Sequence, residues 1–129
     1  MKVLDGKNAV LGRLASFAAK QALKGEDIVV VNCKEIIITG NKKFTEDHFR
    51  KKRGRVGTAQ KGPKISRLAH MIVKRAIRGM LPDHREGRGR IAFKKIKCYP
   101  NVPKEFEQTE KVIFNDKKTN FITVREISK

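Results

Sequence analysis

The run Ile-Val-Val-Val-Asn-Cys at residues 28–33 constrains the fold more than any other part of this chain. Its apolar residues do not alternate with polar ones, and they are mostly β-branched. Such a run is typical of a central strand that is covered on both faces, as in a parallel sheet. The sequence therefore predicts one buried strand with structure packed on either side.

The preceding segment predicts a strand, a turn and a helix. Residues 2–5 are a short strand candidate, followed by Gly6. From about Val10 to Lys24 apolar residues recur at helical spacing, and Gly25 is a stop signal. Residues 36–39 (IIIT) are another strand or a continuation of the buried one after a bend. Because strands alternate with helices, we expect a three-layer α/β/α fold with a mainly parallel sheet of about four strands.

The middle of the chain predicts two helices separated by a basic loop. Thr45 is a candidate cap for a short helix that ends near Lys52, with Phe44 placed to pack against Phe49. Residues 50–64 (RKKRGRVGTAQKGPK) are too charged and too rich in glycine to pack, so they predict an exposed loop that becomes ordered with a partner.

Pro63 then opens a helix over residues 64–79. A 100° step per residue groups its apolar and basic residues on opposite sides. The apolar side holds Ile65, Leu68, Ala69, Ile72, Ala76 and Met80, and the basic side holds Lys64, Arg67, Lys74, Arg75 and Arg78. We expect this helix to dock on a core and to present a basic stripe. Gly79 and Leu81-Pro82 end it.

Beyond this helix, residues 91–98 (IAFKKIKC) predict a further strand. The segments KVIF and FITVREI, with the turn NDKK between them, predict a C-terminal hairpin appended to the domain. The length fits one domain over residues 1–129, with a core of about 1–99 and an extension of about 100–129.

Positive charge is concentrated in one part of the sequence. The formal net charge is +18, and residues 50–98 carry seventeen Lys and Arg against two acids, Asp83 and Glu86, which leaves +15 there. An ordinary solvated face mixes both signs. A single-sign surface of this size is typical of a protein that binds a polyanion, since its cations replace the counterions condensed on phosphate and release them into solution.

The sequence holds no complete catalytic or metal-binding motif. Gly6 and Gly12 have the wrong spacing for a phosphate-binding loop, and we expect Gly6 to make a turn and Gly12 to permit close helix packing. No nucleophile elbow is present, and His48, His70 and His84 lack zinc-site spacing. Cys33 and Cys98 lie far apart in the sequence and indicate reduced thiols in a cytoplasmic protein. No signal peptide or membrane-spanning run is evident, so no membrane association is expected. Because the nucleotide-binding and metal-binding motifs are incomplete, no cofactor is expected either.

The basic residues point to folded RNA as the partner. Arginine forks hold phosphate in a bidentate manner and lysine supplies point charge. Aromatic side chains that would stack on unpaired bases are nearly missing there, since only Phe49 and Phe93 flank the basic part. This composition favours contact with a double-helical backbone, read by shape and charge, over single-strand readout.

Four separated motifs, in order, give the chain a resemblance to a known family. They are LGRLAS at residues 11–16, VVVNCKEIIITGNKK at 29–43, AIRGMLP at 76–82 followed by GR, and KKIKCY at 94–99. The chain resembles the universal L13 family of large-subunit ribosomal proteins over residues 3–99. The segments around residues 50–64 and after Tyr99 are similar to the archaeal and eukaryotic branch, and the compact length indicates an archaeal type.

The resemblance implies an α/β/α fold, no enzymatic activity, and a role in binding and ordering large-subunit rRNA, in the large subunit and beside neighbouring ribosomal proteins. Residues 39–43 match the family's T-G-N-K element and residues 78–82 its R-G-M-L-P element. Gly87-Arg88, or the shifted Gly89-Arg90, matches the following G-R.

Charge and resemblance together predict a set of RNA-binding residues, called here the basic set. Its members are Asn41, Lys42, Lys43, Arg50, Lys51, Lys52, Arg53, Arg55, Lys61, Lys64, Arg67, Lys74, Arg75, Arg78, Gly79, Met80, Arg85, Arg88 and Arg90. Two other functions stay open at this point: a nucleotide-dependent enzyme that uses the turn at residues 6–13, and a general DNA-compacting protein. Of these two, only the enzyme would need a small molecule, a nucleotide. The hypothesis favoured here, a ribosomal protein that binds rRNA, needs no small-molecule substrate.

Overall fold

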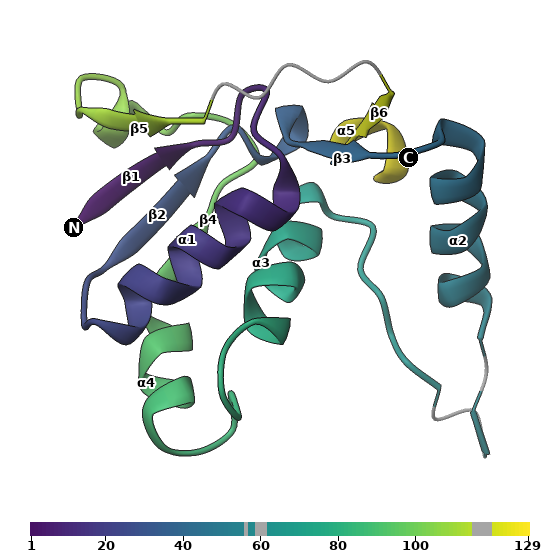
Figure 1. Cartoon of the computed structure of the whole chain (residues 1–129), viewed down its shortest axis with the longest axis horizontal. Helices are drawn as coiled ribbons and strands as arrows, with labels where there is room; N and C mark the ends of the chain where they lie inside the picture. The colour runs from purple at the N-terminus through teal and green to yellow at the C-terminus, as the bar shows by residue number, and fades with distance from the viewer. Residues whose placement is uncertain (56, 59–61, 115–119) are drawn as a thin grey trace.

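The computed structural model describes residues 1–55, 57–58, 62–114 and 120–129. Four strands form one parallel sheet in the order β4-β2-β1-β5 (Figure 1). Their bounds are β1 (Lys2–Asp5), β2 (Ile28–Val31), β4 (Ile96–Cys98) and β5 (Lys111–Ile113). All four residues of β2 are buried. The predicted α/β class, the mainly parallel sheet of four strands and the buried strand at its centre are confirmed.

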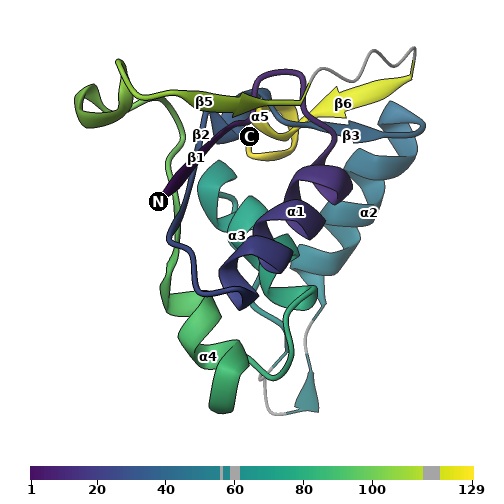
Figure 2. The ribbon, with the colours of Figure 1, turned by 60° about the vertical axis from the view of Figure 1, so that its left-hand side comes forward.

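One face of the sheet is covered by helices. Alternate side chains of β2 point to opposite faces of the sheet. Val30 packs in the main core with α1 (Leu11–Leu23), α3 (Ala69–Gly79) and α4 (Gly87–Lys94). Figure 2 shows α1 and α3 side by side on this face. Four alanines of α1 are buried at or below 4% exposure, which lets α3 approach closely. The core therefore combines bulky β-branched strands with small helical residues.

The opposite face is covered by irregular chain. Val3, Val29 and Val31 pack there against Tyr99, Val102 and Phe106. These partners lie in residues 99–106, which include the single 3-10 turn η3 (Lys104–Phe106). The third layer is thus present, but it is built from a proline-containing segment and not from a long helix.

A second, smaller sheet resolves the alternative for residues 36–39. The chain leaves β2 at Asn32, whose φ is 55°, and makes the 3-10 turn η1 (Cys33–Glu35). It then enters β3 (Ile37–Thr39), which pairs antiparallel with β6 (Phe121–Thr123). Residues 36–39 therefore form a separate strand, in a separate sheet.

The C-terminal segment contributes to an antiparallel pair, as predicted, but with a different partner. β5 extends the main sheet beside β1, and β6 pairs with β3 instead of β5. The short helix α5 (Val124–Ile127) follows, with Val124 and Ile127 buried. The predicted NDKK turn falls at residues 115–118, which lie outside the described residues. The segment after residue 100 is therefore part of both sheets and not an appendage.

Three predicted boundaries in the middle of the chain are wrong. Helix α2 (Lys42–Gly54) begins after Asn41 and not at Thr45. Asn41 Oδ1 accepts the amides of Lys43 and Phe44 at 3.0 and 3.4 Å, whereas the Thr45 hydroxyl donates back to the Asn41 carbonyl. Helix α3 begins at Ala69 and not at residue 64. Ser66 Oγ accepts the Leu68 amide at 3.1 Å, a local turn that competes with helix.

The third boundary concerns residues 87–94, of which 91–94 were expected in a strand. They form helix α4, and only residues 96–98 are extended. Gly89 is buried in its first turn, and a Cβ there would lie 2.4 to 2.5 Å from the carbonyl oxygens of Asp83 and Pro82. This close approach seats the helix and lets Ala92 reach the core. The Gly-Arg run thus does contribute to packing.

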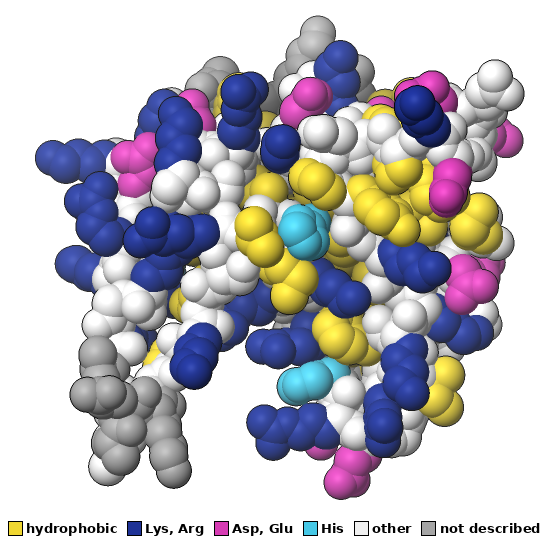
Figure 3. Space-filling view, turned by 180° about the vertical axis from the view of Figure 1, so that it is seen from behind, with side chains coloured by type: hydrophobic (Ala, Val, Ile, Leu, Met, Phe, Trp, Pro, Cys, Tyr) yellow, Lys and Arg dark blue, Asp and Glu magenta, His cyan; other side chains and the backbone are white. Residues whose placement is uncertain are grey.

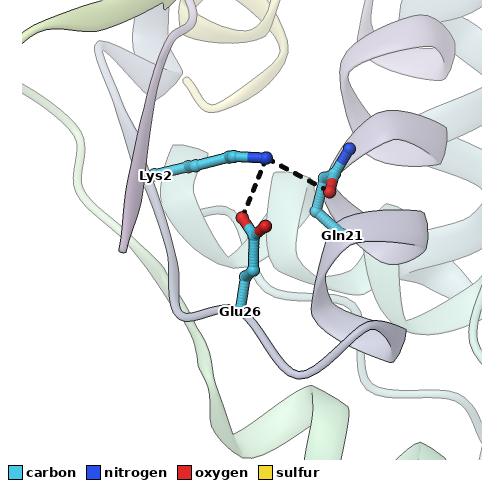
Figure 4. A network of polar contacts seen from close by, with 3 residues as sticks. All are labelled: Lys2, Gln21 and Glu26. Atoms are coloured by element: carbon cyan, nitrogen blue, oxygen red, sulfur yellow. Dashed lines mark hydrogen bonds and ion pairs between the residues drawn. The ribbon is translucent and has the colours of Figure 1, made fainter.

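The link between β1 and the α1–β2 turn is polar. Lys2 Nζ lies 3.0 Å from Glu26 Oε2 and donates to Gln21 Oε1 at 3.3 Å (Figure 4). Because both members of the ion pair are more than one-third exposed, its contribution to stability is small. Because Glu26 pairs with Lys2, this carboxylate does not neutralise a cation of residues 50–98.

The two glycines of the turn at residues 6–13 have different roles from those expected. A Cβ on Gly6 would lie 2.7 to 2.9 Å from Ile36 Cγ1 and the carbonyl oxygens of Val31 and Asn32, and the Gly6 amide donates to Val31 at 2.9 Å. Gly12 is exposed, and a Cβ there meets no atom within 4 Å. The close packing expected at Gly12 is therefore found at Gly6.

Gly6→Ala should lower the free energy of unfolding by roughly 1–3 kcal/mol, because backbone atoms must move to admit the methyl group. Urea titration followed by circular dichroism measures this. Gly12→Ala is the matched control, and it should leave stability unchanged or raise it by up to about 1 kcal/mol. Equal effects of the two substitutions would contradict the assignment.

Candidate nucleic-acid interface

Helix α2 carries the first part of the basic set and has no buried residue. Figure 1 shows it at the side of the molecule, away from the main sheet. Phe49 is half-buried against the core. Two polar contacts tie α2 to the C-terminal segment: Lys42 Nζ to Glu126 Oε1 at 3.0 Å, and Arg53 Nη2 to the Ile127 carbonyl at 2.8 Å. The helix is therefore held at few points and exposes most of its cationic side chains.

The T-G-N-K element forms the junction between β3 and α2. Thr39 ends the strand, Gly40 has a φ of +123°, and Asn41 caps the helix. A positive φ of this size favours glycine, because a Cβ would be strained there. Of the two lysines, Lys43 is exposed and Lys42 is paired with Glu126. Asn41 therefore sets the orientation of the helix that bears the cations.

Arg53 lies at the junction of two neighbouring clefts. The first, of about 500 Å³, is lined by side chains of α2, α5 and Arg67, and we call it the Arg53 cleft. The second, of about 590 Å³, brings Arg53 together with Arg55 and Lys64. The cleft-lining residues include Glu46 and Glu126 in the first cleft and no carboxylate in the second.

The surroundings of Arg53 disfavour its own charge. Partial burial lowers the pKa of Arg53, and the nearby Arg67 guanidinium lowers it further. Arg53 Nε has no hydrogen-bond partner among the described residues. Two cationic groups held close together, one with an unsatisfied donor, form a site that an anionic oxygen would stabilise.

The outward side of α3 carries the predicted stripe in shortened form. Ala69, Ile72, Val73 and Ile77 are buried, while Arg75 is exposed and Arg78 half-exposed. Lys74 Nζ lies 5.1 Å from the centre of the Phe93 ring. Because the helix begins at residue 69, Lys64 and Arg67 lie on the extended segment before it. Leu68 and Met80, expected on the core side, are 58% and 43% exposed.

Residues 80–86 connect α3 to α4 by a turn. Asp83 Oδ1 accepts the Arg85 amide at 2.9 Å, and Gly87 has a φ of +54°. Arg85 is exposed in the turn, and Arg88 and Arg90 are exposed on α4. The arginines therefore project from a folded turn and helix and not from an extended run.

The structure places the described members of the basic set on four consecutive parts of the chain. Lys61 lies outside the described residues. The junction and α2 carry Asn41, Lys42, Lys43, Arg50, Lys51, Lys52 and Arg53; the following segment carries Arg55, Lys64 and Arg67; α3 carries Lys74, Arg75, Arg78 and Gly79; and the turn and α4 carry Met80, Arg85, Arg88 and Arg90. Figure 3 shows lysine and arginine side chains on both sides of a hollow that opens at the lower edge of one face.

Carboxylates neutralise few of these cations. Arg50 lies 3.8 Å from Asp47, and Lys42 pairs with Glu126. For the other lysines and arginines of the basic set that the structure describes, no carboxylate lies within ion-pairing distance. Lys129, which sequence reasoning missed, also lines the Arg53 cleft. Only the long-range pairing of β3 with β6 brings it there, so no local pattern could have revealed it.

Other chemistry-bearing side chains have structural partners. Asp5 Oδ1 accepts the Lys7 amide at 3.0 Å and the Asn32 side-chain amide at 2.9 Å, so it fixes the turn at residues 6–13. A hydrogen bond with Cys98, and then burial, raises the pKa of the Cys33 thiol. Over the described ranges, no cluster of three or more His, Cys, Asp or Glu could hold a metal ion, and no helix is long and apolar enough to cross a membrane.

Comparison with known proteins places this chain in a family. A family model described as ribosomal protein L13 matches residues 1–105. The chain belongs to the ribosomal protein L13 family. It is 41% identical to the large ribosomal subunit protein uL13 of Thermoplasma volcanium and 42% identical to that of Methanocaldococcus jannaschii, covering all of this chain and 96% of each relative. The uL13 of Methanopyrus kandleri is 45% identical over 82% of this chain and 65% of its own length.

The L13 family match confirms the resemblance, including its archaeal type. It extends slightly past the predicted limit at residue 99. The first two relatives align over the full chain, so the C-terminal segment that completes both sheets also has a counterpart in them.

Asn41→Ala should destabilise α2 by roughly 0.5–2 kcal/mol, since two amides of its first turn lose their acceptor. Because α2 has no buried residue, the effect should be local. Hydrogen exchange should speed up over residues 43–54 and stay unchanged over β2.

Asn41→Asp keeps an acceptor oxygen and is the matched control. Faster exchange in both variants, or in neither, would contradict the capping role.

Proposed function

We propose that this protein is a structural constituent of the large ribosomal subunit that binds and orders the large-subunit rRNA through the basic set. The observation that carries this proposal is the scarcity of carboxylate partners for that set, in a chain of the L13 family. The relatives' name, large ribosomal subunit protein, supports the particle as the place of action. The partners would be rRNA and the neighbouring proteins of the subunit, with no membrane and no small-molecule substrate.

The mechanism is electrostatic. Each lysine or arginine that meets a phosphate releases condensed counterions, and this release drives association. Phosphate oxygens at the Arg53 cleft would relieve the repulsion between Arg53 and Arg67. Binding RNA therefore removes a strain that the isolated protein carries.

The fold converts this attraction into ordering of RNA. The cations project from α2, α3 and α4, whose relative positions are fixed by the core, the small sheet and the Lys42 and Arg53 contacts. RNA segments that bind different helices would be held at fixed separations. A flexible basic tail could neutralise the same phosphates but could not hold them in register.

Catalysis has no place in this proposal. Asp5, the carboxylate nearest to the turn that could have bound a nucleotide, accepts two hydrogen bonds that fix that turn. Asp47 and Glu126 pair with cations of α2. These acids act in the proposed function by positioning the chain, and no step of a reaction is assigned to them.

Reversing two exposed charges of the basic set, Arg67→Glu with Arg75→Glu, should weaken binding to large-subunit rRNA and flatten its salt dependence. With six to ten phosphates engaged, wild-type affinity should fall about 10³ to 10⁵-fold between 50 and 200 mM salt. Each lost contact should reduce the slope of log affinity against log salt by about one. Filter binding over a salt series measures both quantities.

Lys20→Glu with Lys24→Glu is the matched control, because it changes the net charge equally at exposed positions of α1 and its C-cap, outside the basic set. It should leave the slope nearly unchanged. Equal loss of slope in the two variants would mean that total charge, and not this surface, governs binding. Equal affinity for duplex DNA at matched salt would favour a DNA-compacting function instead.

A further inference from the structure

A small apolar cleft lies between α2 and α3, beside the Arg53 cleft. Its volume is about 240 Å³, and its walls include Phe49, Ile65 and Met71. Met71 is 43% exposed, so the cleft opens to solvent. Lys52 and Arg75 line the same cleft from two different helices. An apolar slot with cations beside it differs from the Arg53 cleft, whose lining is mostly charged.

Gly79 forms part of the wall of this cleft. It is the last residue of α3 and lines the cleft, and a Cβ there would meet no atom within 4 Å. Its φ is not positive, so the backbone does not require glycine at this position. Neither packing nor conformation within the protein explains the missing side chain. The empty space is instead available to a group from outside the chain.

The shape and chemistry of the cleft fit one nucleobase. Its volume is below the roughly 300–1,000 Å³ of sites for drug-sized ligands, which matches a single flat ring system. Unpaired bases of RNA are recognised by stacking on aromatic rings and arginine guanidinium planes. Phe49 and Arg75 supply one of each. Ser66, also in the lining, accepts the Leu68 amide with its oxygen, which leaves its hydroxyl hydrogen able to meet a base edge.

The charge beside the cleft argues for a nucleotide over an apolar protein side chain. Neither Lys52 nor Arg75 has a carboxylate within ion-pairing distance among the described residues. An apolar side chain of a partner protein could fill the cleft, but it would offer no negative charge to either cation. A nucleotide brings a phosphate on each side of its base, and these phosphates can reach two cations at opposite walls.

We propose that this cleft, called the Phe49 cleft, binds one unpaired base that projects from the rRNA, with Lys52 and Arg75 holding the adjoining phosphates. The inference rests on the proposed function and deepens it. Sequence composition favoured backbone contact alone, because few aromatic residues flank the basic part. In the structure Phe49 of α2 and Met71 of α3 line the same cleft, and this shared lining creates a site for one base within a surface that otherwise binds phosphate.

Gly79→Leu should fill the cleft without changing the charge. Its affinity for in vitro transcribed large-subunit rRNA should fall about 5- to 100-fold, the range for losing one stacked base. Its salt slope should fall by no more than about two, the share of the phosphates held by Lys52 and Arg75, since phosphate contacts made elsewhere are untouched. Gly12→Leu is the matched control: that glycine is also helical and also faces open space, but it does not line the cleft. It should bind as the wild type does.

Met71→Ala tests the same cleft without adding bulk, should Gly79→Leu fail to fold. It removes a wall side chain and should also weaken binding, by about 5-fold or more. Ultraviolet irradiation of the wild-type complex, followed by mass spectrometry, gives an independent readout. Nucleotide adducts are expected on Phe49 or Met71.

Wild-type affinity for both cleft variants, with adducts confined to the lysine- and arginine-bearing segments, would overturn the base-binding proposal and leave the proposed function intact. So would a Gly79→Leu protein that binds naked rRNA normally but is missing from assembled subunits, because the cleft would then receive a neighbouring protein. The proposed function itself fails under a different result: wild-type protein that shows no salt-dependent binding to rRNA.

Discussion

Repulsion among the cations of residues 50–98 is the physical constraint on which this structure depends. The chain places +15 of its +18 net charge there, and its acids are mostly elsewhere. Glu26 pairs with Lys2, and Asp5 fixes a turn. Partial burial and the nearby Arg67 guanidinium together lower the pKa of Arg53. To stay folded without a bound anion despite this repulsion, the protein must draw its stability from parts of the chain that carry little charge.

The parallel sheet and its two coverings supply that stability. The β-branched residues of β2, the alanines of α1 and the buried residues of α3 form one main core, and a smaller cluster under residues 99–106 closes the other face. The cationic elements attach at the rim of this core. Helix α2 is the extreme case, because it has no buried residue and is held by an N-cap, an ion pair and one arginine-to-carbonyl hydrogen bond. The core of this small domain thus lies apart from most of its cations, while Asn41, Lys42 and Arg53 of the basic set also hold α2 in place.

Much of this arrangement could be predicted from local patterns. The β-branched run at residues 28–33 identified the central strand, and the periodicity of residues 10–24 identified α1. Patterns failed where a distant contact decided the outcome. Residues 111–114 and 121–127 have the composition of a hairpin, but β5 finds an edge of the main sheet beside β1, and β6 pairs with β3. The helix over residues 87–94 depends on Gly89 lying against the carbonyls of residues 82 and 83, a contact that no periodicity reports.

For the interface, charge counting and family resemblance predicted a set of residues but not their geometry. The Arg53 cleft needs Lys129 and Ile127 from the far end of the chain, and the Phe49 cleft is lined by residues of α2, of α3 and of the segment between them.

The most direct test of the central claim, that the basic surface lies against RNA, is to compare lysine reactivity in two states. Lysines are acetylated briefly in the free protein and in purified large subunits, and mass spectrometry gives the rate at each site. The account predicts that Lys43, Lys51 and Lys64, all exposed in the free protein, become strongly protected in the subunit, while Lys20 and Lys24 on the α1 side stay reactive. Protection of Lys20 and Lys24 with full reactivity at the other three would contradict it.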